Sequence, residues 1–509
     1  MRVVLIRPEH RTESYDPEVQ EPLGIETLAA VVRQDGHTPM ILDPMLSGQS
    51  EEVTARRAAA FEPDVVGFSA MSPGDLASIG RMSRTIDELS PERPLRIVGG
   101  TLAATEPHTI AQSLPGDFVC IRFEGEEPLL RILRGPRNGE RAAGNGTLAG
   151  APIADLDALP DAERPMAGAL VARGRTLNVQ ASRGCTGSCA YCCAPSFPYP
   201  PGRRWRARSP ERTVDEIATL HRRFGAVGFN FVDDDFLGPP TLAAARAAAF
   251  RDAFASRRLR VAFGVQVRPR SLSVEAIASL VAAGLAYVLV GFETDDATVL
   301  RGWGRRHSGR TFWSSVRRLR AAGVEVQVGC IPFHPQATVT AVKRLMKTLA
   351  ANEALNYRTA TNRLQLLPGS RLSAAAGVTS ASTPPMACPT TEQLHDALVT
   401  ALQPIRPCWV HAISLLPHSV VAERASERGR GPYLAELRNT LAKLDRVVAK
   451  TASALIAVAE RGDDARREAV TLQRANVVAA ESAAHDLASC GAVVSYDLMR
   501  TVIRSESGL

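Results

Sequence analysis

The sequence predicts an α/β protein in which two series of alternating strands and helices precede a helical C-terminal region. Two observations carry this prediction. Short apolar runs alternate with amphipathic stretches over the first 130 residues and again from about residue 175, whereas long alanine-rich amphipathic stretches dominate after about residue 385. With 509 residues, 45% of them hydrophobic and 22% charged, the chain is globular and too long for a single core.

The first series predicts a doubly wound, Rossmann-like domain over residues 1–134. Its strand segments are "RVVLI", "TPMIL", "VVGFS", "LRIVG" and "FVCIR", separated by stretches with helical spacing. In such parallel sheets, ligands bind at the carboxyl ends of the strands. Small residues follow several of these strands, which makes their loops candidate ligand contacts: Ser69, Ala70, Gly99, Gly100, Thr101 and Gly125.

Residues 135–174 predict a linker, because Gly, Pro, Asp and Ala are frequent there and no hydrophobic period is present. A short edge strand within it is an open alternative.

The second series, residues 175–384, predicts a partial (β/α)6 barrel. Residues 221–232, 280–291 and 319–329 share one design, a helix that ends in glycine and is followed by a strand. Strand-like segments at 176–182, 261–267 and 363–369 raise the total to six. The uncharged run from Ala276 to Phe292 approaches the length of a membrane span, but Gly284 divides it into a helix and a strand, so we expect buried core.

A cysteine motif follows the first strand of this second series. Cys185, Cys189 and Cys192 have the spacing C-x3-C-x2-C. Three thiolates on one loop can hold three irons of a cubane cluster and leave the fourth iron open. Zinc is the alternative, but it normally takes four ligands and no second pair of cysteines lies downstream. Cys193 is expected to pack rather than bind.

The loop "RGCTGSCAYCC", at the end of the first strand of a six-unit series, resembles the radical S-adenosylmethionine (SAM) superfamily over residues 175 to about 370. The resemblance implies that Cys185, Cys189 and Cys192 bind a [4Fe-4S] cluster whose free iron chelates SAM. It also implies that Tyr191 packs near the cluster and the adenine.

The same resemblance implies further SAM contacts at the ends of later strands. Asp233 and Asp234 follow the second strand, where a solvated acidic turn is the alternative. Glu293 ends the fourth strand, where a loop salt bridge is the alternative. Weaker candidates, for which surface exposure or an ordinary turn is the alternative, are Arg306, Arg305, Arg268 and residues 366–370.

The first domain adds a second resemblance. The segments "EPLGIETLAAVVRQDGH", "VVGFSAMSP", "RIVGGTLAA" and "EGEEPL" resemble the cobalamin-binding domain of cobalamin-dependent radical SAM enzymes. The D-x-H-x-x-G motif is absent, which implies a corrin without a protein imidazole ligand. A domain that has lost the cofactor or binds another nucleotide is the alternative. The implied contacts are Ser69, Ala70, Met71, Gly99, Gly100, Thr101, Glu124 and Gly125.

These resemblances imply a C-methyltransferase that moves a methyl group from methylcobalamin to an unactivated carbon of a small-molecule or peptide natural-product intermediate. An oxidative cyclase or ring-rearranging enzyme would use the same cofactors without net methylation. A tRNA methylthiotransferase suits the net charge of +7, but it would need three N-terminal cysteines and a C-terminal β-barrel.

The expected partners are the substrate and a one-electron donor of the flavodoxin or ferredoxin type, with no membrane and no nucleic acid. The nine unevenly spaced cysteines and the lack of a readable secretory signal favour a reducing cytoplasm. Residues 385–509 are expected to form a helical domain with no diagnostic chemistry.

Overall fold

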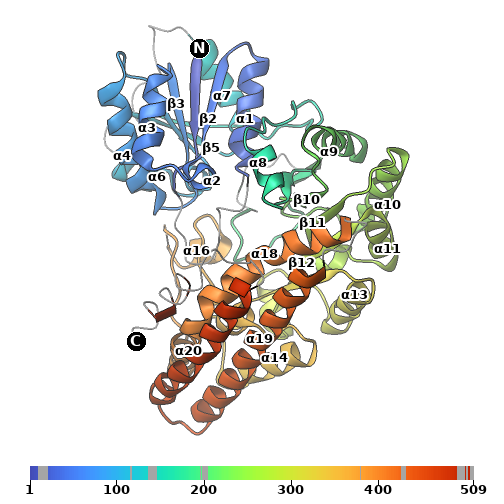
Figure 1. Cartoon of the computed structure of the whole chain (residues 1–509). Coiled ribbons are helices and arrows are strands. Elements are labelled where there is room, and N and C mark those ends of the chain that lie inside the picture. Colours follow the sequence, from blue (N-terminus) through green and yellow to red (C-terminus); the bar gives the residue numbers. More distant parts are fainter. Residues whose placement is uncertain are drawn as a thin grey trace. The chain divides into compact units, whose positions relative to one another are not determined.

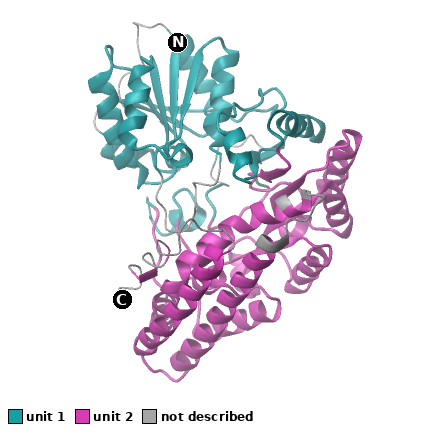
Figure 2. Ribbon diagram, viewed as in Figure 1, with its two compact units in different colours: residues 1–185, 192–225, 367–380 teal, residues 186–191, 226–366, 381–509 magenta. Residues whose placement is uncertain are grey.

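A computed structural model describes residues 1–9, 21–114, 117–135, 146–194, 197, 204–378, 380–425, 431–489, 499, 503 and 504. The chain forms two compact units, shown in different colours in Figure 2. Unit 1 contains residues 1–185, 192–225 and 367–380, and unit 2 contains residues 186–191, 226–366 and 381–509. The loop with the cysteine motif therefore contributes to both units. The predicted domain boundaries at residues 134, 174 and 384 stay predictions.

Unit 1 contains a parallel sheet with the strand order β2-β1-β3-β4-β5-β6. Its strands are β1 (Arg2–Ile6), β2 (Thr38–Leu42), β3 (Val65–Ser69), β4 (Leu95–Gly99), β5 (Phe118–Arg122) and β6 (Thr147–Ala149). The helices between them are α1 (Leu23–Gln34), α2 (Pro44–Ser47), α3 (Glu51–Ala60), α4 (Asp75–Leu89), α5 (Thr101–Thr105), α6 (Pro107–Ser113) and α7 (Glu126–Arg134). The chain order reverses direction at β1 and β3, as in other doubly wound sheets.

Helices cover both faces of this sheet (Figure 1). Side chains alternate along β1, so that Val4 and Ile6 pack with residues of α3, α4 and α6, while Val3 and Leu5 pack with residues of α1 and α7. Two separate apolar cores result, one on each face. The predicted doubly wound domain is confirmed. Strand β6 is the short edge strand that was the alternative within the predicted linker.

The rest of unit 1 contains a buried ion-pair network. Its elements are α8 (Ala167–Ala172), β7 (Leu177–Val179), the antiparallel pair β8 (Ser182–Gly184) and β9 (Trp205–Ala207), α9 (Pro210–Phe224) and α16 (Arg371–Ala375). The Arg164 guanidinium lies 2.9 Å from a carboxylate oxygen of Glu21, 2.8 Å from one of Glu216 and 3.6 Å from one of Glu26. These four residues connect the start of α1 with α9.

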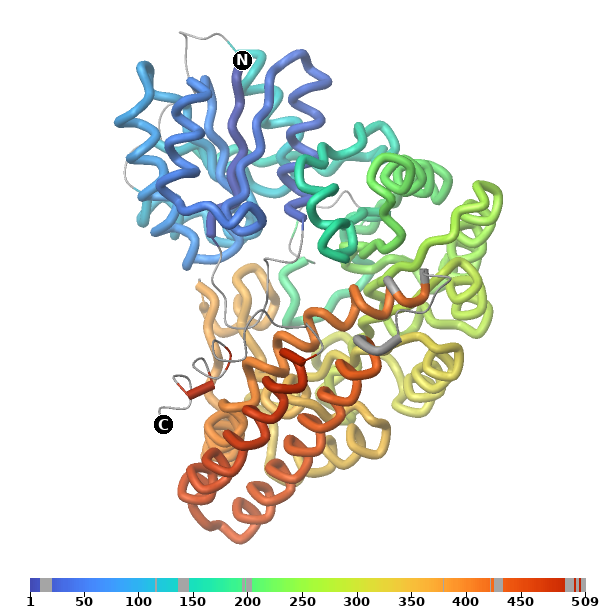
Figure 3. The backbone as a smooth tube through the Cα atoms, in the orientation of Figure 1, coloured from blue at the N-terminus to red at the C-terminus, as the bar shows by residue number. Residues whose placement is uncertain are grey.

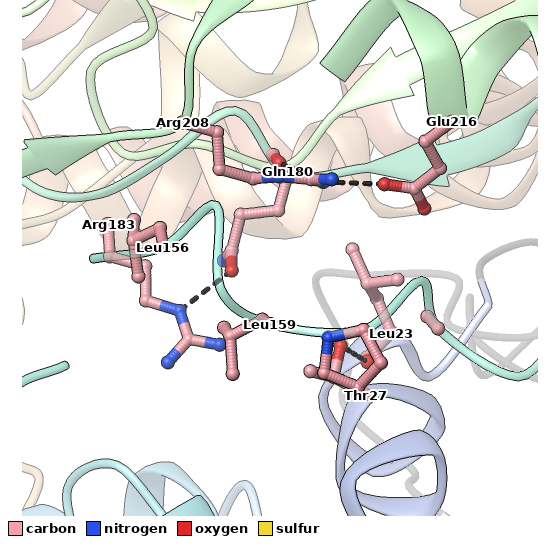
Figure 4. A pocket seen from close by; sticks show the side chains of 10 residues that line it. Leu23, Thr27, Leu156, Leu159, Gln180, Arg183, Arg208 and Glu216 are labelled. Carbon is pink, nitrogen blue, oxygen red and sulfur yellow. Dashed lines mark hydrogen bonds and ion pairs between the residues drawn. The ribbon is translucent and has the colours of Figure 1, made fainter. Parts of the chain in front are cut away.

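Glu216 also pairs with Arg208 beside a small cavity of about 20 Å³, where Arg183 donates to Gln180 (Figure 4). That volume holds about one water molecule. The cavity is therefore part of the packing of unit 1 and too small for a cofactor.

In unit 2, four parallel strands are neighbours in the order β13-β12-β11-β10. They are β10 (Gly228–Phe231), β11 (Ala262–Val267), β12 (Leu285–Glu293) and β13 (Glu325–Cys330). The intervening elements are α10 (Pro240–Ser256), the 3₁₀ turn η3 (Pro269–Ser271), α11 (Val274–Ala283), α12 (Ala297–Gly302) and α13 (Gly309–Ala321), followed by α14 (Val339–Ala351) and α15 (Tyr357–Thr361). The predicted repeat of helix, glycine and strand is confirmed.

Gly284 shows why a glycine must stand between helix and strand. Its φ is +109°, and a Cβ at this position would collide with the carbonyl oxygen of Val261. The run from Ala276 to Phe292 is divided at this residue into α11 and β12, as predicted. Within the described residues, no helix is long and apolar enough to cross a membrane.

The sixth expected strand, residues 363–369, is not a regular strand. Arg363 bridges to Phe333 and Leu366 bridges to Ser382, each as an isolated pair. Proline at position 368 has no N–H to donate, and Gly369 turns the chain with φ +80°. Among the described residues, the strand at the sixth barrel position is thus reduced to single bridges.

The predicted C-terminal helices are confirmed, and they belong to the same compact unit as β10–β13. They are α17 (Pro389–Leu402), the short η4 (Gln403–Ile405), α18 (Arg406–Ala425), α19 (Gly431–Glu460) and α20 (Ala465–Ser489). Helices α17, α19 and α20 pack along one another (Figure 3), and α18 lies against β10, β11 and β12. The helical region thus covers strands of the second sheet.

Candidate functional site

The cysteine motif lies on a loop after β8. Cys189, in unit 2, is 8% exposed, whereas Cys185 and Cys192, in unit 1, are partly exposed. Cys189 forms no disulfide. Cys189 can be placed against its neighbours within unit 2, where the ends of β10, β11 and β12 surround the loop residues 186–191.

Arg305 contacts Cys189 directly. Its Nη1 lies 3.7 Å from the Cys189 Sγ, and its Nη2 donates to the Gly291 carbonyl oxygen at 2.6 Å. The same Nη2 lies 3.0 Å from Oε1 of Glu293. Burial lowers the pKa of Arg305, but Glu293, Tyr191 and Cys189 raise this pKa by more, so the guanidinium stays cationic.

The end of β12 is shaped to hold this arginine. The strand pairing shifts register between Gly291 and Glu293, and Glu293 has φ +68°. Such an irregularity turns a side chain away from the regular alternation of a strand. A Cβ at position 291 would lie 2.7 Å from the Arg305 Nη2, so a side chain there would displace the ion pair of Arg305 and Glu293.

Tyr191, the aromatic residue before the third cysteine, also belongs to this group. Its hydroxyl donates to the Glu293 carboxylate, and its ring packs edge-on against Trp303 at a centroid distance of 5.4 Å. The Ala190 N–H donates to the Trp303 carbonyl oxygen at 2.9 Å. Burial raises the pKa of the Tyr191 hydroxyl, which therefore keeps its proton.

Glu293 is consequently occupied by protein partners. Glu293 as a residue is 8% exposed, the pKa of its carboxyl is raised by burial, and Arg305 and Tyr191 oppose that rise. The loop salt bridge that the sequence left as an alternative is present. Its role as a SAM contact stays a prediction.

The acidic turn after β10 separates into buried and exposed carboxylates. Asp233 and Asp235 are buried, at 3% and 0% exposure, and Asp234 is exposed. Of the two predicted ligands, Asp234 is the more exposed, although the surrounding protein desolvates its carboxyl and raises its pKa.

Asp235, which sequence reasoning missed, bonds to the motif loop. Thr186 Oγ1 donates to its Oδ2 at 3.3 Å, and Arg268 Nη1 donates to the same hydroxyl oxygen at 2.7 Å. Burial raises the pKa of Asp235 to about 6, although Arg268 lowers it. Three adjacent aspartates offered no local signal for this role, because the bond to Thr186 spans 49 positions in the sequence.

The two arginines at positions 305 and 306 differ in the structure. Arg305 is 7% exposed and bonded as above, whereas Arg306 is exposed. The proposed cofactor contact at Arg306 stays a prediction. Adjacent arginines look alike in a sequence, and only the tertiary fold distinguishes them.

In unit 1, the loops after β3 and β4 lie side by side. Ala70 N–H donates to the Gly99 carbonyl at 2.9 Å, and Gly100, with φ +96°, approaches Ala70 so closely that a Cβ would lie 2.5 Å from the Ala70 carbonyl oxygen. Ser69 pairs with Gly99 in the sheet. Met71 is 49% exposed, and its Sδ lies 3.9 Å from Thr101 Oγ1.

Glu124 and Gly125 follow β5, and Glu124 is engaged by arginines. Its carboxylate pairs with Arg183 and Arg206 and accepts the Ile153 N–H at 2.7 Å. Burial raises the pKa of Glu124, but these partners together lower it below its ordinary value. Glu124 therefore holds the linker, and its role as a cofactor contact stays a prediction.

Two family models match this chain, one in each series of alternating strands and helices. The sequence model of the radical SAM superfamily matches residues 179–349, and that of the B12 binding domain matches residues 17–133. Together they match more than half of the chain, in the order of a corrin domain followed by a radical domain. The chain belongs to the cobalamin-dependent radical SAM enzymes.

Two curated relatives match this chain over more than half of its length. An uncharacterised methyltransferase of Pyrococcus horikoshii is 24% identical over 369 residues, which are 68% of this chain and 77% of that protein. The anaerobic magnesium-protoporphyrin IX monomethyl ester cyclase of Rubrivivax gelatinosus is 27% identical over 58% of this chain, which spans about half (55%) of the cyclase.

Among solved structures, the cobalamin-dependent SAM radical enzyme OxsB with aqua-cobalamin bound superposes with a TM-score of 0.74 at 14% identity. The match covers 100% of this chain and 84% of OxsB. At this identity the likeness shows a shared fold.

The cofactors of this radical SAM family are a [4Fe-4S] cluster, SAM and cobalamin. The motif offers a fitting donor set, since its three cysteines lie on one loop and the Arg305 N–H points at the Cys189 sulfur. Within the described part of the chain, no three His, Cys, Asp or Glu side chains converge as the ligands of one metal ion do. A cubane cluster does not need such convergence, because each thiolate binds a different iron.

The loops after β3 and β4 fit a flat corrin in one respect. Gly100, Thr101 and Met71 are exposed at the carboxyl edge of the sheet, which is where doubly wound folds bind ligands. Which of these residues contact the cofactor stays a prediction.

Proposed function

We propose that this chain is a C-methyltransferase that transfers a methyl group from methylcobalamin to an unactivated carbon of a small-molecule or peptide natural-product intermediate. The observation that carries the proposal is the pairing of a B12 binding domain with a radical SAM domain in one chain. A relative whose sequence is matched by this chain over 77% of its length is named a methyltransferase, which supports the same reaction class.

The bound cofactors would supply the difficult chemistry. The reduced cluster and SAM would supply a hydrogen-abstracting radical, with methionine as the second fragment, and methylcobalamin would supply the transferable methyl group. The protein would bind and orient the cofactors and the substrate, and it would exclude water from them. Cys185, Cys189 and Cys192 would hold the cluster, with Tyr191 and Trp303 packing the loop. Asp234, which is exposed after β10, would pair with the cationic amino group of SAM.

A one-electron donor of the flavodoxin or ferredoxin type would reduce the cluster. We further propose that the protein works in the cytoplasm, where such donors and free thiols are maintained.

The test of the proposal is cofactor loading followed by product mass. Protein purified without oxygen and reconstituted with iron, sulfide and hydroxocobalamin is expected to retain about four irons and one cobalt per chain. Incubation with a low-potential reductant and SAM carrying a deuterated methyl group should then add labelled methyl to the substrate. Four irons without cobalt would contradict the assignment of a corrin.

Cysteine variants test the ligand set. Cys185→Ala, Cys189→Ala and Cys192→Ala should each lose the absorbance of the cluster and all activity, because each removes the ligand of one iron. Cys193→Ala is the matched control and should keep the cluster spectrum. If Cys193→Ala alone lost the cluster, the ligand assignment would be wrong.

A cyclase or ring-rearranging enzyme is the second candidate. The relative from Rubrivivax gelatinosus, named a cyclase, favours it. The same incubation separates the two functions, since a cyclase consumes SAM without incorporation of labelled methyl into the product.

A further inference from the structure

The guanidinium of Arg305 is a buried cation held on three sides. Its Nη2 contacts the Gly291 carbonyl oxygen at 2.6 Å and Oε1 of Glu293 at 3.0 Å. Its Nη1 is the group left to face the Cys189 Sγ, at 3.7 Å. Because the two Nη2 contacts fix the plane of the guanidinium, the direction of the Nη1–H is fixed as well.

The segment that carries Arg305 is also tied to the motif loop by its backbone. Trp303, two residues before Arg305, accepts the N–H of Ala190, which is the residue after Cys189. The ring of Trp303 contacts Tyr191 on the same loop. The arginine and the cysteine therefore keep their separation through a main-chain bond and a ring contact that do not involve either side chain.

A hydrogen bond or a positive charge beside a cluster sulfur stabilises the state that carries the extra electron, because that state has more negative charge on its sulfurs. The effect is strong where water is excluded. Arg305 and Cys189 are 7% and 8% exposed, so little solvent screens them.

We infer that Arg305 is a positioning residue that raises the reduction potential of the iron–sulfur cluster through its N–H contact to Cys189. This inference rests on the proposed function, in which Cys189 binds one iron of the cluster. Glu293, Gly291 and Tyr191 serve the same end, because they hold the guanidinium in place. The arginine thereby eases the transfer of one electron from the external donor to the cluster.

The experiment is a redox titration of the full-length, reconstituted protein without substrate. The reduced cluster is followed by electron paramagnetic resonance and by loss of visible absorbance, so that no catalytic turnover enters the measurement. The variants are Arg305→Met, which removes the charge and the N–H, and Arg305→Lys, which keeps the charge without the planar fork. Arg301→Met is the matched control, since Arg301 is exposed and donates to Thr298.

Arg305→Met should shift the midpoint potential to a more negative value at unchanged iron content, and Arg305→Lys should lie between it and the unchanged protein. Arg301→Met should titrate like the unchanged protein. Equal potentials for Arg305→Met and the unchanged protein overturn the inference, and so does an equal shift in Arg301→Met.

If Arg305→Met assembles no cluster, Arg305→Lys decides. An ammonium cannot contact Gly291, Glu293 and Cys189 at once in this geometry, so a lowered potential supports the inference and an unchanged one overturns it. Failure of the unchanged protein to assemble a cluster would instead remove the proposed function, and this inference with it. A normal cluster with an unshifted Arg305→Met potential would leave the proposed function standing.

Discussion

Arg164 in unit 1 and Arg305 in unit 2 are both buried arginines, and they differ in what surrounds them. Arg164 has three carboxylates within 3.6 Å and donates to the Asn178 carbonyl oxygen. Arg305 has one carboxylate, one carbonyl oxygen and one cysteine sulfur. A buried cation among carboxylates has its charge neutralised and holds elements together. A buried cation that faces a thiol has an N–H that can donate to that sulfur. Partners rather than burial separate a structural arginine from a tuning one.

The largest expected effect is at Arg164. Arg164→Met leaves Glu21, Glu26 and Glu216 buried without their shared cation, so the free energy of unfolding should fall by about 3–5 kcal/mol. Urea unfolding of the full chain, followed by circular dichroism, measures the loss. Arg164→Lys, which keeps the charge, should lose less. A loss below about 1 kcal/mol in Arg164→Met would remove the structural half of the comparison.

Arg305→Met should cost less stability than Arg164→Met. Only Glu293 loses a cationic partner, and Tyr191 still donates to it, so we expect about 1–3 kcal/mol. The same urea experiment on protein without cofactors provides the number. Equal losses at the two arginines would mean that Arg305 is as structural as Arg164.

The ion-pair network of Arg164 should also make stability depend on pH, through Glu26. Its pKa is raised well above its ordinary 4.5, first by burial and then by the charge of Glu21, although Arg164 opposes the rise. A raised pKa in the folded state means stability that is present below pH 4.5 and lost as pH rises through the folded pKa.

Glu26→Gln removes this dependence. As pH increases from 4.5, the unfolding free energy of the variant should therefore rise relative to that of the unchanged protein, by about 1–3 kcal/mol. Thermal unfolding at a series of pH values provides the measurement, and a gap that shrinks with pH would show that Arg164 compensates Glu26 fully.

The smallest effect is expected at an exposed arginine. Arg56 pairs with Glu52 at 2.8 Å one helical turn away, and both side chains are more than 60% exposed. Arg56→Ala should change the free energy of unfolding by less than about 1 kcal/mol, and added salt should reduce that change further. A larger loss would mean that an exposed ion pair can stabilise this fold as much as the buried pairs of Arg164 and Arg305 do.

Much of the fold was predictable because it depends on local periods. The alternation of strands and helices, the glycine at position 284 and the helical region after residue 385 follow from spacing within a few residues. The sixth strand was wrongly expected, because an apolar segment reports its propensity but not whether a neighbour is in register to pair with it.

By itself, the sequence determined the family and supplied the candidate cluster ligands, since three cysteines at fixed spacing and a characteristic order of domains are properties of the chain as written. Only the tertiary structure decided that Arg305 rather than Arg306 faces Cys189, and that Asp235 rather than its neighbours bonds to Thr186. These contacts join residues 116 and 49 positions apart, and no local pattern encodes which side chains meet when distant strands end at one edge of a sheet.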